Sequence, residues 1–453
     1  MARYLERFYV ISVILLLAVV FFREFVNLGI LENLETVTLI MVLIPGVILA
    51  KGIPFYMSLG SLILGHFLIL KYNMAYTIWL EGITKNLPLA IVFLMVPVLS
   101  IPLKEGGYLQ AVNYFISKYV AKTCSLFFAL SSSVFGLASI ANLGAVRVFH
   151  DLVEEVNLPP RFLAKVYSTG FASCMTWSPY FASVNLVLYY TGVSFNSYFL
   201  PGFLYGLFLL VLGNLLFYKD RQCQNEVRLS AHKIDEPADS RKKLYFLVLN
   251  LIGLFLAVII GEKFFAFSSM MLLVSILALV YAVFWSLGIK RFKEFLQQMK
   301  GYDQNILQVK NEMVFFLSVG FLGVVLANTP LKGYIEVFFK QLSGYYVFIV
   351  IEVIIILIAL LSVVGIHHVI TITALGLSLK AQVLGLSDLS YSLTLIASYT
   401  ISMILSPFAP FNIIAGGLLK ENSFVVSLKW NRNFAIMAIL FSGVFITLVN
   451  YLF

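Results

Sequence analysis

Long apolar runs, separated by short polar segments, follow one another along the whole chain. Within a run, polar and apolar positions do not alternate, as they would over about ten residues in a transmembrane β-strand. Many runs approach the roughly 20 residues that a helix needs to cross the hydrocarbon core of a bilayer. The pattern therefore predicts an all-α polytopic membrane protein.

We expect about eleven transmembrane helices and two re-entrant hairpins. The hairpins are assigned to residues 124–150 and 345–379, because these apolar segments also carry polar residues and glycines. The predicted spans are residues 8–22, 35–50, 54–71, 84–103, 162–190, 196–217, 244–260, 263–287, 312–330, 391–418 and 433–453.

The composition supports this class. Of the 453 residues, 61% are hydrophobic and 12% are charged, about half the charged fraction of a soluble protein. This excludes a soluble enzyme and a secreted disulfide scaffold. The net charge of +9 is explained by cytoplasmic loops rather than by nucleic acid, so we expect no nucleic-acid partner. The three cysteines, Cys124, Cys174 and Cys223, lie far apart and show no metal-binding or disulfide spacing.

Basic residues indicate the orientation, because Lys and Arg are retained in cytoplasmic loops. The segments 218–243 and 290–310 are strongly basic, and two spans separate them. Arg3 and Arg7 precede the first run, and no small-residue cleavage site follows it, so we expect an uncleaved helix. If each hairpin returns to the side it entered, the basic loops, including 420–432, all lie inside. The N-terminus is then cytoplasmic and the C-terminus outside.

Two short motifs recur at one offset, which indicates an internal duplication. Pro102-Leu103-Lys104 matches Pro330-Leu331-Lys332, and Ser178-Pro179 matches Ser406-Pro407, each 228 residues later. The first Pro-Leu-Lys is expected inside and the second outside, so the repeats are inverted, as in many secondary transporters. We divide the chain into an extra helix (1–34), a first inverted repeat (35–217), a cytoplasmic linker (218–243) and a second inverted repeat (244–453).

Polar residues in the hairpins are expected at turns near the middle of the bilayer, where exposed backbone survives only if it lines a cavity. Amphipathic segments at 107–122 and 331–343 precede the hairpins and are expected in the membrane interface. The polar and glycine residues around the two expected turns are Ser131, Ser132, Ser133, Gly136, Ser139, Asn142 and Gly144, and Ser362, Gly365, His367, His368, Thr371 and Thr373.

The two Ser-Pro segments are expected to break their helices. Pro179, and the pair Pro407 and Pro410, remove backbone hydrogen bonds and free carbonyl groups. Such carbonyls, with Ser and Asn oxygens, coordinate a hard monovalent cation, while half-helix N-termini attract an anion. A kinked helix held by its neighbours is the simpler reading of one segment, but two equivalent segments, each with a hairpin, favour a binding site.

Three ionisable groups add to the candidate site. Arg147 either binds a carboxylate or oxyanion, or extends to the surface beside His150, Asp151 and Glu154. One of His367 and His368 is a proton carrier or hydrogen-bond donor, whereas a metal site lacks a third ligand. Glu352 either pairs with a cation or lies near the outer interface. The substrate-binding candidates are Ser139, Asn142, Arg147, Ser178, Asn185, His367, His368, Ser406 and Asn412, and the ion-coupling candidates are Ser139, Asn142, Ser178, Thr371, Ser406, Asn412 and Glu352.

The layout resembles the ion transporter superfamily, in particular the divalent anion:sodium symporters and the arsenite and citrate permeases. Ser139-Ile140-Ala141-Asn142 resembles the hairpin signature of that family, and the two Ser-Pro segments with Asn185 and Asn412 resemble its broken-helix turns. In the second hairpin, Gly365-Ile366-His367-His368 replaces the signature. The resemblance implies a sodium site, a substrate between the two halves, and a homodimer.

We therefore expect a secondary active transporter of a small anionic solute, coupled to Na⁺ or H⁺, in the plasma membrane of a bacterium. Apart from Na⁺ as coupling ion we expect no cofactor, and the partners are the substrate and the lipid bilayer. A cation/proton antiporter, with Glu352 and the histidines as proton carriers, is an alternative. An intramembrane enzyme acting on a lipid-linked substrate and a ligand-free membrane scaffold are alternatives of other classes.

Overall fold

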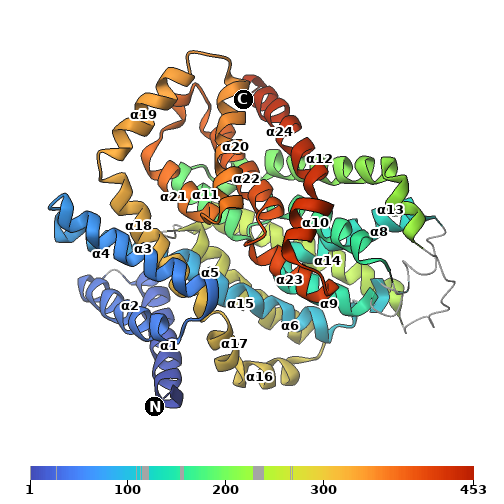
Figure 1. Ribbon diagram of the computed structural model, residues 1–453. Coiled ribbons are helices and arrows are strands. Elements are labelled where there is room, and N and C mark those ends of the chain that lie inside the picture. The colour runs from blue at the N-terminus through green and yellow to red at the C-terminus, as the bar shows by residue number, and fades with distance from the viewer. Residues whose placement is uncertain are drawn as a thin grey trace. The chain divides into compact units, whose positions relative to one another are not determined.

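The computed structural model describes residues 2–26, 28–108, 110–112, 114, 122–153, 158–227, 239–265, 267 and 269–452. Within these residues the regular elements are all helices (Figure 1). In this described part of the chain, twelve helical segments are long and apolar enough to cross a membrane. The predicted fold class, an all-α polytopic membrane protein, is confirmed. The segment predicted to be amphipathic at 107–122 lies largely outside the described residues.

The helices form two compact units, each assembled from segments distant in sequence. Unit 1 holds residues 1–98, 260–338 and 369–379, and unit 2 holds 99–259, 339–368 and 380–453. Each unit thus contains segments from both halves of the chain. The two predicted repeats are consecutive along the sequence, whereas these units are defined by packing. The division into repeats therefore stays a prediction.

Unit 1 is centred on α18, which packs against α2, α3, α4 and α5. Phe321 of α18 fills the space left by two glycines: a Cβ would lie 2.4 Å from this ring at Gly65 and 2.8 Å at Gly82. Small residues allow this close approach between helices in a membrane. The helices of unit 1 are α1 (Ala2–Phe25), α2 (Gly29–Leu49), α3 (Gly52–Lys71), α4 (Tyr76–Lys85), α5 (Leu87–Met95), α15 (Met270–Gly288), α16 (Phe292–Lys300), α17 (Tyr302–Gln308), α18 (Lys310–Ala327), most of α19 (Leu331–Leu342), and α21 (His368–Ser378) apart from its first residue.

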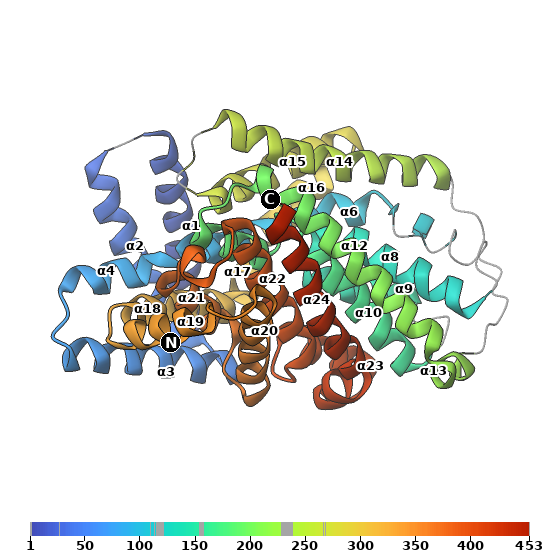
Figure 2. The ribbon, with the colours of Figure 1, turned by 90° about the horizontal axis from the view of Figure 1, so that it is seen from above.

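Unit 2 is built around α10 and α22, whose side chains are buried along almost their whole lengths. The first packs against α8 and α12, and the second against α20 and α24 (Figure 2). Both are rich in Ser and Thr, whose hydroxyls donate to carbonyls one turn earlier, as Ser173 does to Thr169 O and Ser398 to Thr394 O, each at 2.7 Å. The helices of unit 2 are α6 (Ser100–Glu105), α8 (Thr123–Ala141), α9 (Leu143–Val153), α10 (Pro160–Met175), α11 (Ala182–Thr191), α12 (Phe195–Lys219), α13 (Arg221–Glu226), most of α14 (Ser240–Phe264), α20 (Val347–Val364), α22 (Asp388–Leu405), α23 (Pro410–Leu419) and α24 (Arg432–Leu452).

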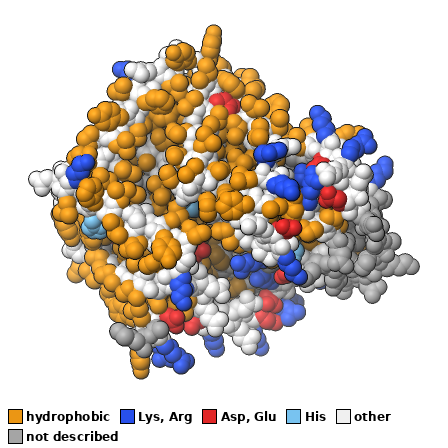
Figure 3. Space-filling view, in the orientation of Figure 1, with side chains coloured by type: hydrophobic (Ala, Val, Ile, Leu, Met, Phe, Trp, Pro, Cys, Tyr) orange, Lys and Arg blue, Asp and Glu red, His pale blue; other side chains and the backbone are white. Residues whose placement is uncertain are grey.

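Large apolar side chains cover much of the surface, as one face shows in Figure 3. Examples are Leu70 and Phe284 in unit 1 and Leu360 and Leu448 in unit 2, all more than half exposed. A soluble monomer rarely exposes large contiguous apolar patches. This surface is suited to contact with lipid, as expected of an integral membrane protein.

Candidate functional site

The first predicted hairpin breaks at Asn142, between α8 and α9. Asn142 has a φ of 50° and a ψ of −139°, a backbone conformation outside the left-handed helical region that residues with a side chain rarely adopt. Its Oδ1 accepts from Leu143 N at 2.8 Å, and its Nδ2 donates to Tyr180 O at 3.5 Å. The side chain therefore fixes the turn and joins it to the first Ser-Pro segment.

The expected turn around Ser131, Ser132 and Ser133 is wrong, because α8 continues as a helix to Ala141. Ser131 and Ser133 donate to the carbonyls of Phe128 and Ala129, one turn earlier. These local bonds satisfy the hydroxyls without breaking the helix. Of the polar residues in this hairpin, only those near Asn142 lie at the turn.

The first Ser-Pro segment separates α10, which ends at Met175, from α11, which begins at Ala182. Ser183 Oγ donates to Met175 O at 2.6 Å across this break. Asn185 Nδ2 donates to Pro179 O at 2.5 Å and to Phe181 O at 2.9 Å. Pro179 cannot donate to Met175 O, and Ser183 binds that carbonyl instead. The Asn185 amide binds Pro179 O in the break and Phe181 O at the start of α11, where Phe181 O also accepts from Asn185 N at 3.2 Å. These bonds fix the shape of the break.

The second Ser-Pro segment separates α22, which ends at Leu405, from α23, which begins at Pro410. Asn412 Nδ2 lies 2.9 Å from the oxygens of Met403, Ile404 and Ser406. The two N–H groups of this amide therefore share three carbonyls. Met403 O and Ile404 O lose their helical partners at the break, and Ser406 O also accepts from Ala409 N at 3.1 Å. Asn185 and Asn412, both predicted from sequence, have the same structural role in their two helices.

Each Ser-Pro serine also binds a hairpin. Ser178 Oγ donates to Ser139 O at 2.6 Å, and Ser406 Oγ donates to Ser362 O at 2.7 Å. In both cases the same Oγ accepts from the backbone N–H two residues later, Tyr180 at 3.2 Å and Phe408 at 3.3 Å. Two segments 228 residues apart thus make the same pair of bonds.

Two acceptor oxygens at the breaks have no hydrogen-bond partner among the described residues. They are Asn185 Oδ1 and Asn412 Oδ1, on side chains that are 1% and 0% exposed. Their amide nitrogens are occupied by carbonyls, so each oxygen is held in place but left without a donor. Such oxygens are ligands of the kind that a hard cation prefers.

The two breaks belong to elements that pack together in unit 2. α10 contacts α22 and α23, and α9 contacts α23. Phe171 of α10 stacks on Phe411 of α23, with ring centroids 4.8 Å apart. The structure therefore brings together the elements that carry Ser139, Asn142, Ser178 and Asn185 with those that carry Ser406 and Asn412.

The second hairpin places histidines beside an aromatic residue of α22. α20 ends at Val364, and Gly365 follows with a φ of 109°, a conformation that favours glycine. The His368 ring lies 4.2 Å from that of His367 and 4.3 Å from that of Tyr399. His368 is 1% exposed, and neither ring nitrogen has a hydrogen-bond partner within the described part of the chain. Tyr399 was not predicted from the sequence, because nothing distinguishes it from the other polar residues of α22.

The remaining candidates lie in different surroundings. Arg147 is exposed on α9, and no ion pair to it occurs within the described residues, which exclude Glu154. Thr371 belongs to α21 of unit 1 and is half-buried. Glu352 of α20 is 8% exposed and faces Gly443, where an added Cβ would lie 2.1 Å from Glu352 Oε1.

Contacts between helix ends show which loops of unit 2 are neighbours. Gly107, after α6, lies beside Lys243 of α14, because an added Cβ would be 3.2 Å from Lys243 Nζ. Lys165 Nζ of α10 binds Asp220 Oδ2, after α12, at 2.7 Å. Lys429, before α24, lines one pocket together with these two residues.

The opposite ends of these helices also meet. Thr191, at the end of α11, accepts from Ser392 Oγ of α22 at 2.8 Å. Ser387 N, before α22, donates to Asn450 Oδ1 of α24 at 2.8 Å. The ends of α11 and α24 and the start of α22 therefore lie together.

No protein-family model and no curated protein matches the sequence. Among solved structures, the YdaH transporter of Alcanivorax borkumensis matches over 87% of this chain and 98% of its own, with 15% identity and a TM-score of 0.50. MtrF of Neisseria gonorrhoeae, from a class of antimetabolite efflux pumps, matches over 83% and 84% with 12% identity and a TM-score of 0.47. At such low identity, the likeness to YdaH concerns the fold alone. The chain therefore shares the fold of the YdaH transporter.

Proposed function

We propose that this protein is a secondary active transporter of a small anionic solute, with transport coupled to Na⁺ or H⁺. The observation that carries the proposal is the pair of equivalent Ser-Pro breaks. Each serine binds a hairpin carbonyl, and each nearby asparagine binds carbonyls at the break. An enzyme needs one catalytic cluster and gives no reason for this duplication, whereas alternating access uses two related halves.

Helix-end contacts support a re-entrant first hairpin. Gly107 and Lys243 are neighbours, and the described helices between them are the first hairpin, the α10–α11 pair, α12 and the six-residue α13, which is too short to cross a membrane. If the broken helix and α12 each cross the membrane, the two residues share a face only when the hairpin does not cross. The same reasoning assigns the start of α10 to that face.

The second hairpin is supported in the same way. Asp220 and Lys429 line one pocket, and α14, α15, α18 and the broken α22–α23 lie between them in sequence. Four crossings return the chain to the same face, and a crossing hairpin would make five. The two Pro-Leu-Lys motifs are then on opposite faces, which makes the repeats inverted, with the N-terminus inside and the C-terminus outside.

The chemistry of the breaks favours a cation as the coupling ligand and an anion as the cargo. We assign the oxygens of Asn185 and Asn412, with Ser178 and Ser406, to Na⁺. We assign the anion to Arg147, Asn142 and His368, because a guanidinium fork binds carboxylates and oxyanions. This arrangement would place the protein near the divalent anion:sodium symporters, as a homodimer in a bacterial plasma membrane.

A cation/proton antiporter is the second candidate. It is favoured by Glu352, a nearly buried carboxylate without a side-chain hydrogen-bond partner within the described residues. Intramembrane carboxylates commonly mark ion or proton pathways. In this case protons, rather than an anion, would be exchanged for the cation.

Uptake into proteoliposomes distinguishes these functions. Purified protein is reconstituted and offered labelled carboxylates and oxyanions, with a sodium gradient and a pH gradient imposed separately. We expect at least one anion to accumulate with only one of the gradients. If no anion accumulates, and a proton gradient instead drives ²²Na⁺ movement that Glu352→Gln abolishes, the protein is an antiporter. Empty liposomes and Asn412→Leu protein are the controls.

A further inference from the structure

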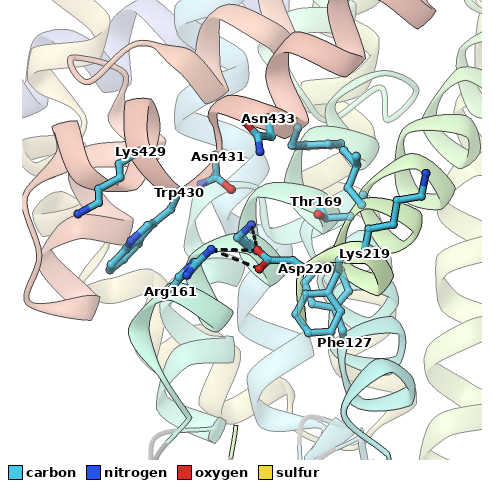
Figure 4. Close-up of a pocket in the computed structure, with 14 residues that line it drawn as sticks. Phe127, Arg161, Thr169, Lys219, Asp220, Lys429, Trp430, Asn431 and Asn433 are labelled. Atoms are coloured by element: carbon cyan, nitrogen blue, oxygen red, sulfur yellow. Dashed lines mark hydrogen bonds and ion pairs between the residues drawn. The ribbon is translucent and has the colours of Figure 1, made fainter. Parts of the chain in front are cut away.

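Unit 2 contains a basic pocket away from the two breaks, at the start of α10, the end of α12 and the start of α24 (Figure 4). Its volume is about 320 Å³. The transport proposal assigns no role to this pocket. The polar side chains of its lining include Arg161, Lys165, Lys219, Asp220, Lys429 and Asn431.

Cationic side chains outnumber acidic ones in this basic pocket. Asp220 is its one carboxylate among the described lining residues, and it is bound by Lys165 at 2.7 Å and Arg161 at 3.1 Å. Burial favours the neutral acid, but the hydrogen bonds from Lys165 and Cys223 N and the nearby charges outweigh it and lower the pKa of Asp220. The carboxylate is therefore ionised and already neutralised by two cations.

Two further lysines leave the basic pocket with excess positive charge. Lys219 and Lys429 lie on opposite sides of it in Figure 4, and neither makes an ion pair with a described residue. Glu226, outside the lining, binds Arg161 at 3.2 Å. With this second carboxylate there are four cations and two acids, so the basic pocket carries net positive charge and attracts anions.

Polar and apolar groups narrow the choice of anion. Asn431 is 1% exposed, donates to Val426 O at 3.0 Å, and leaves Oδ1 without a partner within the described residues. Its side chain points toward the basic pocket in Figure 4, so Oδ1 is placed to accept a hydrogen bond. Phe127 and Phe217 stack with centroids 4.1 Å apart and form an apolar wall. A ligand with an anionic head, a hydroxyl and an apolar body matches these three features.

The segment that supplies Lys429 and Trp430 has unusual backbone geometry. Residues Val425–Trp430 form a π-helix directly before α24. π-helical turns are rare and occur frequently at functional sites. Trp430 is half-buried, as expected of an aromatic residue at the interface between lipid and water.

We propose that this basic pocket binds a phosphate group, and that its main source is the headgroup of an acidic phospholipid such as phosphatidylglycerol. Lys219 and Lys429 bind the phosphate, Asn431 Oδ1 accepts from a headgroup hydroxyl, and the phenylalanine wall contacts the acyl region. A soluble phosphate ester offers the same phosphate and hydroxyl chemistry without the apolar body. The proposal does not depend on what the protein transports.

Quenching of Trp430 fluorescence tests the proposal in full-length protein reconstituted into vesicles. Brominated phosphatidylglycerol and brominated phosphatidylcholine are compared, and the Trp430→Phe variant identifies the part of the signal that belongs to Trp430. We expect Trp430 to be quenched at a lower mole fraction of the brominated acidic lipid. The K219Q/K429Q double variant should weaken this preference for the acidic lipid by about 30-fold, since each lysine near the surface contributes roughly a fivefold effect.

Matched variants separate a site from general surface charge. K219R/K429R should retain the acidic-lipid effect, and K293Q/K300Q, which removes two lysines of α16, should leave it unchanged. Equal quenching by the two lipids, or equal effects of K219Q/K429Q and K293Q/K300Q, would overturn the proposal. Relief of quenching by millimolar glycerol phosphate would support the phosphate site but overturn the lipid as its main occupant.

Discussion

Replacement of Asn412 by Leu tests the central element of the proposed site. The leucine removes the amide that binds Met403 O, Ile404 O and Ser406 O, each at 2.9 Å. Side-chain hydrogen bonds in membrane proteins contribute about 0.6 kcal/mol each on average, so three should contribute about 2 kcal/mol. If transport needs the break in its present shape, this energy corresponds to about a 30-fold loss of uptake.

The duplication supplies graded controls for this prediction. Asn185 binds two carbonyls, so Asn185→Leu should lower uptake by a smaller factor, on the order of tenfold. Asn328→Leu removes one local bond, to Val324 O, on an exposed side chain, and should change uptake less than about twofold.

The assay is initial uptake, into proteoliposomes, of whichever anion accumulates in the panel described above. Thermal denaturation of each purified variant shows whether it is folded, and ²²Na⁺ binding provides a readout that does not require the anion. Normal uptake by a folded Asn412→Leu protein would refute the reasoning. So would equal losses in the Asn412 and Asn328 variants, because the number and burial of the bonds would then be irrelevant.

Three further predictions concern other parts of unit 2. Asp220→Asn should lower the free energy of unfolding by about 2 kcal/mol at pH 7. Folding lowers the pKa of Asp220, so this difference from the native protein should disappear only as the pH falls below 3.8. Denaturation at several pH values would measure it. Arg147→Lys should weaken an anionic substrate strongly, seen as a raised KM for uptake, and an unchanged KM would assign Arg147 to the membrane surface. Gly443→Ala should destabilise the protein by about 1–3 kcal/mol through contact with Glu352, and Glu352→Ala in the same chain should restore part of the thermal midpoint; no restoration would contradict the observed packing.

The fold class and the helix breaks could be predicted from the sequence. Continuous apolar runs have few stable arrangements in a bilayer other than helices. Proline lacks an N–H group, so Pro179 and Pro407 inside apolar spans predict breaks, and the structure has non-helical segments at 176–181 and 406–409. Local chemistry at these positions determines the local structure.

The sequence did not show which of the polar residues in each hairpin form its turn, or which groups in the site bind one another. Ser131 and Ser133 remain helical because their hydroxyls bind carbonyls of the same helix, which the hydrophobic pattern does not reveal. Ser178 binds Ser139, so an offset of 228 residues would pair Ser406 with His367. The observed partner of Ser406 is Ser362, because α20 already ends at Val364. The basic pocket unites Lys165, Asp220 and Lys429 through tertiary packing, and no local signal connects them.

The serine hydroxyls at the breaks have a consequence for how cations and anions act on the protein. A hydroxyl can donate one hydrogen bond. Ser406 donates it to the carbonyl of Ser362, and Ser178 donates it to the carbonyl of Ser139. A cation binds the lone pairs of the hydroxyl oxygen and leaves the hydrogen bond to the hairpin intact. An anion that accepts the hydrogen bond instead breaks the link between the serine and the hairpin. Ser178 Oγ and Ser406 Oγ would thus hold the hairpins in place when a cation is bound and release them when an anion is bound.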